Sequence, residues 1–342
     1  MGPDLFFLYR QMLRSRRFEE AVKSVWDAGK ISGEMHLGIG EEAIAAGVVG
    51  HLQDGDAMSL DYRCTPPLII RGIDPVLLLN EFMGKKSGLC GGQGGHMHMF
   101  SRSHLVASSG IVGASGPVGA GFALAAQYLG KDNVALAFFG EGAFNQGSTM
   151  EALNLAAIWK LPLIFVCKNN KWAISTVSRS VTGGDLLERA RGLGVPGSEV
   201  DGTDVEAVWK AAGDAIDMAR EGGGPSFLMA HCSRLGGHFL GDPLQRVDMG
   251  DTGRRLMASL ATRPGAELPE RIRSIVTLLS MVGGTSGLKP GGRNDPIIRL
   301  RKKLNHDRPK LEEIENAVER EMRDVMQATF VNTAEDMEKE AL

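Results

Sequence analysis

The chain has 342 residues, of which 43% are hydrophobic, and a net charge of −3 at neutral pH. That is enough apolar material for a substantial core, and acidic and basic residues are mixed along the chain, so neither nucleic acid nor an anionic membrane is expected as a partner. No apolar run approaches the roughly 18 residues of a membrane-spanning helix, and the N-terminus lacks a signal-peptide pattern. The four cysteines are scattered without a CxxC pair, which fits reduced thiols in a cytoplasmic protein and argues against a zinc site.

Taken in chain order, the hydrophobic pattern predicts an amphipathic helix first and then an alternation of helices and strands. The first helix is expected from Phe6 to Ala28, where apolar residues recur at helical spacing. The later helices are expected at Val118 to Leu129, Ser148 to Trp159 and Asp204 to Arg220, and the strands at Val134 to Phe139, Leu163 to Cys167 and Pro225 to Ala230. Short apolar runs separated by helices predict an α/β fold with a mostly parallel sheet and helices on both faces.

The pattern weakens after this sheet. Between Leu240 and Asn294, prolines and paired glycines interrupt it, and helical order returns from Lys310 to Ala328. We therefore expect one domain over residues 1–342, with a core at about 30–243. An irregular, mobile excursion is expected at about 244–292, followed by a C-terminal helical segment at about 293–342.

A glycine-rich turn follows the predicted strand that ends at Phe139. It reads Gly140-Glu141-Gly142-Ala143, and a helix comes next, so the turn is a candidate anion site at the carboxyl end of a strand. Asn170 stands 29 positions after Glu141. One strand–helix–strand unit occupies about 30 residues, so both side chains are predicted to reach the same edge of the sheet. A carboxylate and an amide oxygen there suit a hard cation.

Three features leave alternatives open at this point. By itself the turn at Gly140 also fits a dinucleotide loop or a simple close turn, although Asn145 occupies the place of the third glycine in the dinucleotide fingerprint. The glycines between Gly113 and Gly121 suit either a ligand contact or close helix packing. His96 and His98 fit either a metal pair or, as we favour, a loop or capping feature.

The turn, the Asn169-Asn170 pair and the linking segment from Glu151 to Pro162 together resemble a known motif. They are similar to the thiamine diphosphate motif of the E1 α subunits of pyruvate, branched-chain 2-oxo-acid and acetoin dehydrogenases. The resemblance runs from about His36 to Pro243, with a weaker match from Asp295 to Leu300. It implies the thiamine diphosphate-binding fold.

The resemblance also implies roles for the motif residues. The side chains of Glu141 and Asn170 and the carbonyl of Trp172 would hold Mg²⁺. The amides of Gly142 and Ala143 would meet the diphosphate. Other positions carried over from the family are Ile174, which would support the bent cofactor, and Tyr62, Arg63 and Arg234, which would contact the diphosphate.

Further matches concern the reacting end of the cofactor. The backbone at Gly110 and Val112 would receive the aminopyrimidine ring. His36 and His238 match active-site histidines, which are expected to handle protons or to steady the substrate carboxylate near neutral pH.

The sequence departs from the family pattern at four places. Glu141 replaces an Asp, which moves the carboxylate away from the chain by about 1.5 Å and can alter metal geometry. Lys168 replaces a Glu and adds positive charge near the expected metal. Cys64-Thr65-Pro66-Pro67 replaces a His-Gly segment and removes a histidine, and Phe239 replaces a serine that some relatives phosphorylate.

The resemblance predicts an E1 α subunit that acts on a 2-oxo acid, with pyruvate preferred. Its expected partners are an E1 β subunit in an α₂β₂ assembly and the lipoyl domain of an E2 protein, which accepts the acyl group. Two alternatives remain: an acetoin dehydrogenase α subunit, and a non-catalytic homologue suggested by Glu141, Lys168 and the missing His-Gly segment.

Overall fold

Seven strands form the central sheet of the computed structural model, which describes residues 2–174, 176–241, 251–276, 291–292 and 294–340. The strand order is β2-β3-β1-β4-β5-β9-β8. The strands are β1 (Ala57–Leu60), β2 (Phe100–Ser101), β3 (Val106–Ser108), β4 (Ala135–Gly140), β5 (Leu163–Asn169), β8 (Gly197–Asp201) and β9 (Ser226–His231). All neighbours are parallel except β2 and β3. The predicted mostly parallel sheet is confirmed.

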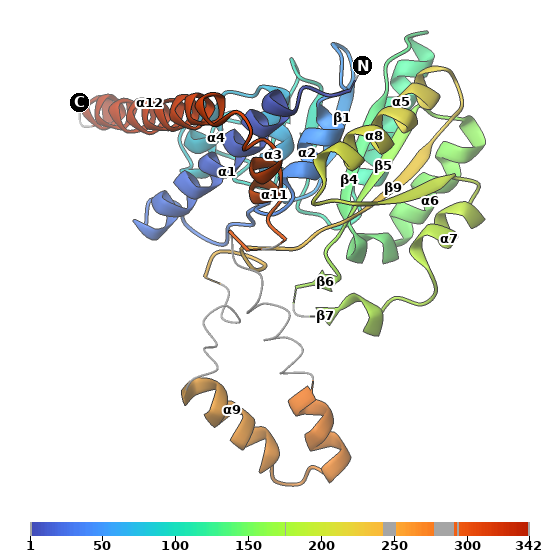
Figure 1. Ribbon diagram of the computed structural model, residues 1–342, viewed down its shortest axis with the longest axis vertical. Helices are drawn as coiled ribbons and strands as arrows, with labels where there is room; N and C mark the ends of the chain where they lie inside the picture. Colours follow the sequence, from blue (N-terminus) through green and yellow to red (C-terminus); the bar gives the residue numbers. More distant parts are fainter. Residues whose placement is uncertain (1, 175, 242–250, 277–290, 293, 341–342) are drawn as a thin grey trace.

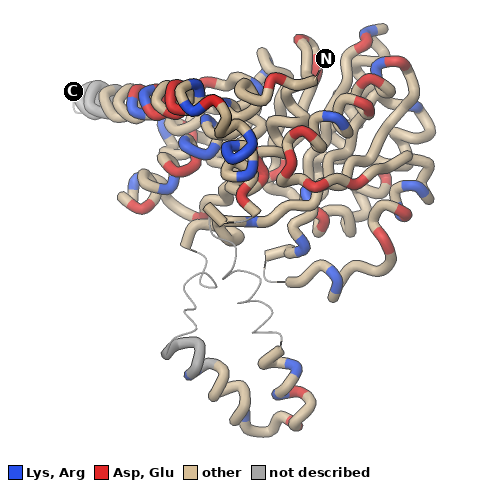
Figure 2. The backbone as a smooth tube through the Cα atoms, viewed as in Figure 1, with Lys and Arg blue, Asp and Glu red and all other residues tan. Residues whose placement is uncertain are grey.

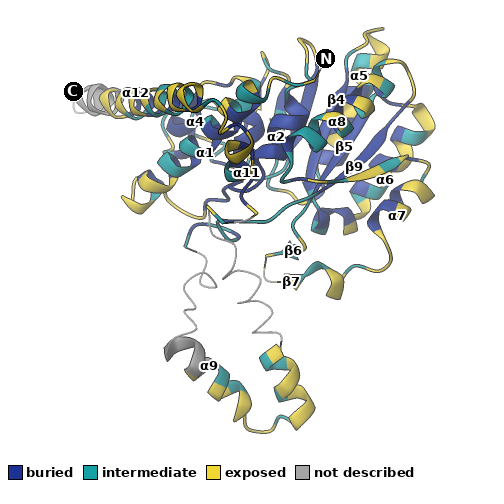
Figure 3. Cartoon of the chain, in the orientation of Figure 1, coloured by how far each residue is buried: buried dark blue, intermediate teal, exposed yellow. Residues whose placement is uncertain are grey.

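Side chains alternate between the two faces of the central strands, because successive residues of a strand point in opposite directions. On one face Leu136, Phe138 and Val166 join a core built with α1, α2, α3, α4 and α8. On the other face Phe139 and Phe165 join a second core built with α5, α6 and α7. Both faces of the sheet are covered, as Figure 3 shows by the buried strands between partly exposed helices.

The helices confirm the predicted alternation. Those near the sheet are α1 (Leu5–Asp27), α2 (Glu42–Val49), α3 (Thr65–Arg71), α4 (Pro75–Phe82), α5 (Ser115–Tyr128), α6 (Gly147–Trp159), α7 (Leu186–Gly192) and α8 (Val205–Arg220). The chain closes with α11 (Pro296–Lys303) and the long α12 (Arg308–Glu340), which lies along α1 and α4 (Figure 1). Acidic and basic residues are interspersed over the body and along α12 (Figure 2). None of the helices described is long and apolar enough to cross a membrane.

The segment predicted to be irregular contains helices. Helix α9 spans Asp251–Ala261, and residues 268–276 are also helical. The prolines do not prevent these helices, because Pro264 lies between the two and Pro269 lies in a first turn, where proline is tolerated. Residues 244–250 and 277–290 of that segment lie outside the described part of the chain. The division into one domain with this excursion stays a prediction.

Buried charges join α1 to α2 and to the segment before α11. Arg16 contacts Glu42 at 2.6 Å and Asp295 at 2.9 Å, and all three side chains are at most 6% exposed. Asp295 also accepts a hydrogen bond from the amide of Ile297 and caps α11. This ion-pair network attaches the C-terminal segment to the N-terminal helix, because a buried charge needs close partners.

Glu19 lies beside this network and holds the chain that leads away from His36. Its Oε1 accepts a 2.6 Å hydrogen bond from the amide of Gly38, whereas Oε2 has no hydrogen-bond partner among the described residues. Burial, reinforced by the charge of Glu42, raises the pKa of Glu19 to about 8. The carboxyl group is therefore protonated at neutral pH in the folded protein.

We expect Glu19→Gln to remove a pH-dependent loss of stability while keeping an acceptor for Gly38. As the pH rises from about 4 to 8, Glu19 ionises in the unfolded chain but stays protonated in the folded one, which lowers the wild-type free energy of unfolding. The free energy of unfolding of the variant, relative to that of wild type, should therefore increase over this pH range by at most about 5 kcal/mol. This limit follows from the rise of the Glu19 pKa from 4.5 to about 8, at about 1.4 kcal/mol for each pKa unit. Urea unfolding at pH 5, 7 and 9 measures it. Glu20→Gln is the matched control, and a pH-independent difference for Glu19→Gln would contradict the protonated state.

Candidate functional site

The carboxyl ends of β4 and β5 meet at one edge of the sheet. Gly140 pairs with Lys168, so the segments that follow, from Glu141 and from Asn169, leave the sheet side by side. The amide of Asn170 donates to Glu141 Oε2 at 3.2 Å. The prediction that the 29-residue spacing brings the two residues together is confirmed.

A cavity of about 420 Å³ opens at this edge, and all thirteen residues selected from the sequence line it. They are His36, Tyr62, Arg63, Gly110, Val112, Glu141, Gly142, Ala143, Asn170, Trp172, Ile174, Arg234 and His238. These residues come from the segments after β1, β3, β4, β5 and β9 and from the segment before α2. The structure therefore brings together every residue that the sequence singled out, although their roles stay a prediction.

Oxygen atoms suited to a cation gather in one corner of the cavity. Glu141 is 1% exposed, and its Oε1 accepts a 2.5 Å hydrogen bond from Ser178 Oγ. Asn170 Oδ1 lies nearby and accepts from the amide of Trp172 at 3.1 Å. Burial raises the pKa of Glu141, because the hydrogen bonds it accepts only partly offset the loss of water. A buried carboxylate with the side chain of Asn170 beside it fits a hard divalent cation, which takes oxygen ligands.

The chain folds back over this corner as a short hairpin of β6 (Trp172–Ala173) and β7 (Thr176–Val177). Lys171 and Ile174 adopt left-handed backbone angles, with φ of +67° and +54°. That conformation is costly for a β-branched residue such as Ile174 and is typical of functional sites. A Cβ at Gly142 would meet the Cβ of Ala173 at 3.0 Å, so glycine allows the turn to approach the hairpin.

Two arginines and a histidine form the cationic side of the cavity. Arg63 is 3% exposed and donates to the carbonyls of Leu37 and His238 at 2.7 and 2.6 Å. Arg63 and Arg234 each place a guanidinium nitrogen 3.0 Å from His238 Nδ1. Because a guanidinium only donates, His238 Nδ1 accepts and the ring proton lies on Nε2. Burial, followed by the charges of Arg63 and Arg234, lowers the pKa of His238 to about 3.

His36 lies in a cluster of aromatic rings beside these arginines. Its ring centroid is 4.7 Å from that of Tyr62 and 4.8 Å from that of His238. Burial, and then the charge of Arg63, lowers the pKa of His36 to about 3. Both active-site candidates are thus neutral at pH 7 in this state. They can donate or accept hydrogen bonds there but do not carry the positive charge that would steady a carboxylate.

His96 belongs to the same cluster, although nothing in the sequence indicated that it lies beside His36. Its Nε2 lies 2.9 Å from His36 Nδ1, and the two rings stack. Within the described residues, no group of three or more His, Cys, Asp or Glu side chains is placed to hold a metal ion. Burial lowers the pKa of His96 to about 4. Only the pairing of two distant loops reveals this histidine.

The ammonium group of Lys168 is paired with acidic side chains other than Glu141, the carboxylate of the candidate cation site. Its Nζ contacts Glu41 Oε2 at 2.8 Å and Asp61 Oδ1 at 2.9 Å. Although burial works in the opposite direction, the carboxylates of Asp61 and Glu41 raise the pKa of Lys168, which keeps the amine charged. The positive charge that the sequence predicted near the expected metal is therefore paired with two acidic side chains.

Two glycines of α5, Gly116 and Gly119, serve helix packing. A Cβ at Gly119 in α5 would lie 2.9 Å from the Cβ of Ala137 in β4, and one at Gly116 would lie 3.3 Å from the Cβ of Ala152 in α6. Helix α5 therefore approaches the sheet and α6 closely through its glycines. Close helix packing is the alternative that the structure supports for these two residues.

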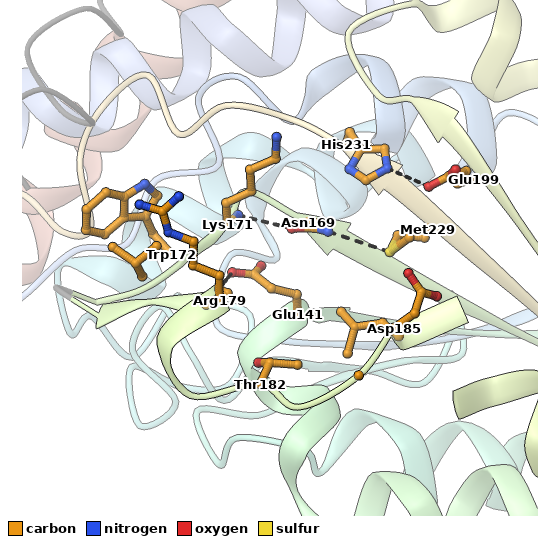
Figure 4. A pocket seen from close by; sticks show the side chains of 14 residues that line it. Glu141, Asn169, Lys171, Trp172, Arg179, Thr182, Asp185, Glu199, Met229 and His231 are labelled. Atoms are coloured by element: carbon orange, nitrogen blue, oxygen red, sulfur yellow. Dashed lines mark hydrogen bonds and ion pairs between the residues drawn. The ribbon is translucent and has the colours of Figure 1, made fainter. Parts of the chain in front are cut away.

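A second cavity, of about 470 Å³, also has Glu141 in its lining (Figure 4). Arg179, Thr182 and Asp185 line it from the segment after β7, and His231 contacts Glu199 at 3.0 Å across its far side. Glu141 lines both cavities and so forms part of the wall between them.

Comparison with known proteins agrees with this geometry. A sequence profile of the dehydrogenase E1 component family matches residues 10–249. The α subunit of acetoin:2,6-dichlorophenolindophenol oxidoreductase from Cupriavidus necator is 47% identical over 240 residues, which cover 70% of this chain and 72% of that protein. The pyruvate dehydrogenase E1 component subunit α from Rhizobium meliloti is 43% identical over 237 residues, covering 69% and 68%.

These matches identify the class of protein that the sheet and the cavity define. The chain belongs to the dehydrogenase E1 component family. Within that family it is an α-type chain of the thiamine diphosphate-dependent 2-oxo-acid dehydrogenases, since the matched proteins are pyruvate and acetoin dehydrogenase α subunits.

We expect His238 to be neutral, with its proton on Nε2, in the ligand-free protein between pH 6 and 8. Nitrogen-15 NMR of labelled histidine measures this state directly. Arg234→Gln should move the pKa of His238 upward toward its usual value, because one of the two positive charges beside Nδ1 is lost. Arg179→Gln, in the second cavity, is the matched control. A proton on Nδ1 at pH 7 would refute the assignment.

Proposed function

We propose that this chain is the α subunit of an E1 enzyme that catalyses oxidative decarboxylation of a 2-oxo acid, with pyruvate as the preferred substrate, and passes the acyl group to the lipoyl domain of an E2 protein. The observation that carries the proposal is the convergence of all thirteen family-matched residues on one cavity. The two departures near the cation corner do not remove its chemistry, because Glu141 still supplies a carboxylate and Lys168 is neutralised by acids.

The residues present fit thiamine diphosphate and Mg²⁺. Glu141, Asn170 and the Trp172 carbonyl would hold the metal, and one protein carboxylate suffices because Mg²⁺ is usually shared with phosphates. Arg63, Arg234 and Tyr62 would contact the diphosphate, together with the amides of Gly142 and Ala143. When bound, the cofactor supplies the electron sink needed to break a carbon–carbon bond next to a carbonyl.

The histidines would work at the other end of the cavity. Gly110 and Val112 would receive the aminopyrimidine ring, and Ile174 would support the cofactor from below. His238 would donate a hydrogen bond from Nε2, and His36 would do so or accept one, according to how it shares a proton with His96. A neutral ring can orient a substrate oxygen without placing a second fixed charge beside the arginines.

A partner subunit would complete the cavity. Three apolar side chains at its rim are largely exposed: Ile111 at 71%, Val112 at 48% and Ile174 at 57%. Exposed apolar groups around a polar site are typical of a surface that another chain covers. We propose an E1 β subunit as this partner in an α₂β₂ assembly, located in the cytoplasm.

Acetoin cleavage is the second candidate, because acetoin-type α subunits from two organisms match at 47% and 42% identity. The side-chain pocket for the substrate would be shared with the partner, so residues of this chain alone do not identify which of the two substrates is used. The non-catalytic alternative loses its main support, since Lys168 is paired with Glu41 and Asp61 and His96 lies against His36.

The complex with its β partner should bind thiamine diphosphate in a metal-dependent way. Calorimetry in Mg²⁺ should show saturable binding, and chelation should abolish it, because the diphosphate then lacks its counter-charge. Glu141→Ala should weaken binding at least about tenfold, whereas Glu141→Asp, which keeps a carboxylate, should bind. Equal binding with and without divalent cations would contradict the assigned corner, and no binding by the complete complex would favour the non-catalytic homologue.

The chain by itself should not turn over substrate, because its cavity is open where the partner would lie. We expect 2-oxo-acid decarboxylation only after the β subunit is added, with pyruvate consumed faster than acetoin or 3-methyl-2-oxobutanoate. Activity of the purified chain alone would argue against a shared site. Faster turnover of acetoin would transfer the assignment to the second candidate.

A further inference from the structure

The structure assigns a positioning role to Lys168, and the assignment rests on the proposed function. We propose that its ammonium group joins the loop after β1, which carries Arg63, to the end of β5, which carries Asn170, so that the diphosphate-binding and metal-binding sides of the cavity keep a fixed separation.

Three contacts support this role. Lys168 Nζ donates to Glu41 Oε2 at 2.8 Å, to Asp61 Oδ1 at 2.9 Å and to the carbonyl of Arg63 at 3.4 Å. These acceptors lie 105 to 127 positions away along the chain. One ammonium group, which has three donors, thus connects β5, the N-terminus of α2 and the loop after β1.

Asp61 links Lys168 to the backbone of Arg63. The same Oδ1 atom that Lys168 contacts also accepts a 3.1 Å hydrogen bond from the amide of Arg63. Arg63 is therefore held at its amide through Asp61 and at its carbonyl by Lys168 directly. Its guanidinium group then reaches the carbonyls of Leu37 and His238.

Burial makes these contacts selective for one geometry. The side chains of Lys168 and Glu41 are each 3% exposed, and that of Asp61 is 15% exposed. A charge removed from water needs close partners, so rearrangements that separate the amine from its carboxylates are strongly disfavoured. A flexible surface ion pair would not restrain the loop in this way.

Lys168 lies two residues before Asn170 and pairs with Gly140, the residue before Glu141. The adjacent ends of β4 and β5, where Lys168 is anchored, therefore lead directly into the segments that carry the candidate side-chain metal ligands Glu141 and Asn170. Because Arg63 and Asn170 would bind opposite parts of one cofactor–metal unit, a small displacement between the two loops should weaken cofactor binding more than it slows chemistry.

The test measures thiamine diphosphate binding to the assembled α and β subunits in Mg²⁺ with Lys168→Met. We expect the Kd to rise by about 10–100-fold, the range for residues that orient ligands of a bound group. The kcat at saturating cofactor should change less than the affinity. Lys168→Arg, which keeps the charge and the donors, should recover part of the affinity, and Lys131→Met, an exposed lysine remote from the cavity, should bind like wild type.

A triple variant separates positioning from stability. Lys168→Met alone leaves two carboxylates without their cation and should lower the melting temperature, whereas adding Glu41→Gln and Asp61→Asn removes those charges and should restore stability. We expect the triple variant to melt near wild type yet bind the cofactor weakly. If it binds like wild type, the positioning role is wrong. If wild type itself does not bind thiamine diphosphate, the proposed function fails instead.

Discussion

The parallel alignment of β4 between β1 and β5 is the constraint on which the site depends. All three strands are buried on both faces, so most of their side chains are apolar, and most of the polar groups of the site lie at the strand ends and in the segments that follow. In a parallel sheet those ends share one edge. The segments that begin with Asp61, Glu141 and Asn170 therefore converge, and the cavity forms where they meet.

The electrostatics of the cavity follow from this convergence. The charged groups of the cavity are buried and have partners close by. Lys168 contacts Glu41 and Asp61. Arg63 and Arg234 both donate to Nδ1 of His238. Among the described residues, Glu141 accepts hydrogen bonds from Ser178 and Asn170 and forms no close ion pair. In the proposed complex, a divalent cation bound to the diphosphate would be held by the carboxylate of Glu141, and the phosphate oxygens would accept hydrogen bonds from the arginines.

The departures from the family pattern are accompanied by local adjustments. The longer side chain of Glu141 is held at Oε1 by Ser178 from the far side of the β6–β7 hairpin. The segment that begins at Cys64 lacks the family's histidine, yet Cys64 Sγ lies 3.4 Å from the carbonyl of His96, whose ring reaches His36. An imidazole thus stands beside His36, although it comes from another loop.

Local pattern alone determined much of this protein. Apolar runs bounded by turn residues predicted β4, β5 and β9. The usual length of a strand–helix–strand unit predicted that Glu141 and Asn170 reach the same edge of the sheet. The family motif selected the thirteen residues that line the cavity. Strand β8 was not predicted from the sequence, because Gly197–Asp201 lies at the edge of the sheet, where side chains are partly exposed and no apolar run is required.

What only the tertiary structure decided are the pairings between distant segments. Lys168 meets Glu41 across 127 positions, Arg63 meets His238 across 175, and His36 meets His96 across 60. No local propensity encodes such contacts, because they depend on how helices and strands pack around a common core. The same packing excludes water, and burial then shifts the pKa values that make His36 and His238 neutral and Glu19 protonated. The sequence was thus enough to identify which residues line the cavity. Their contacts and their protonation states were decided by the packing of the folded chain, because burial changes both.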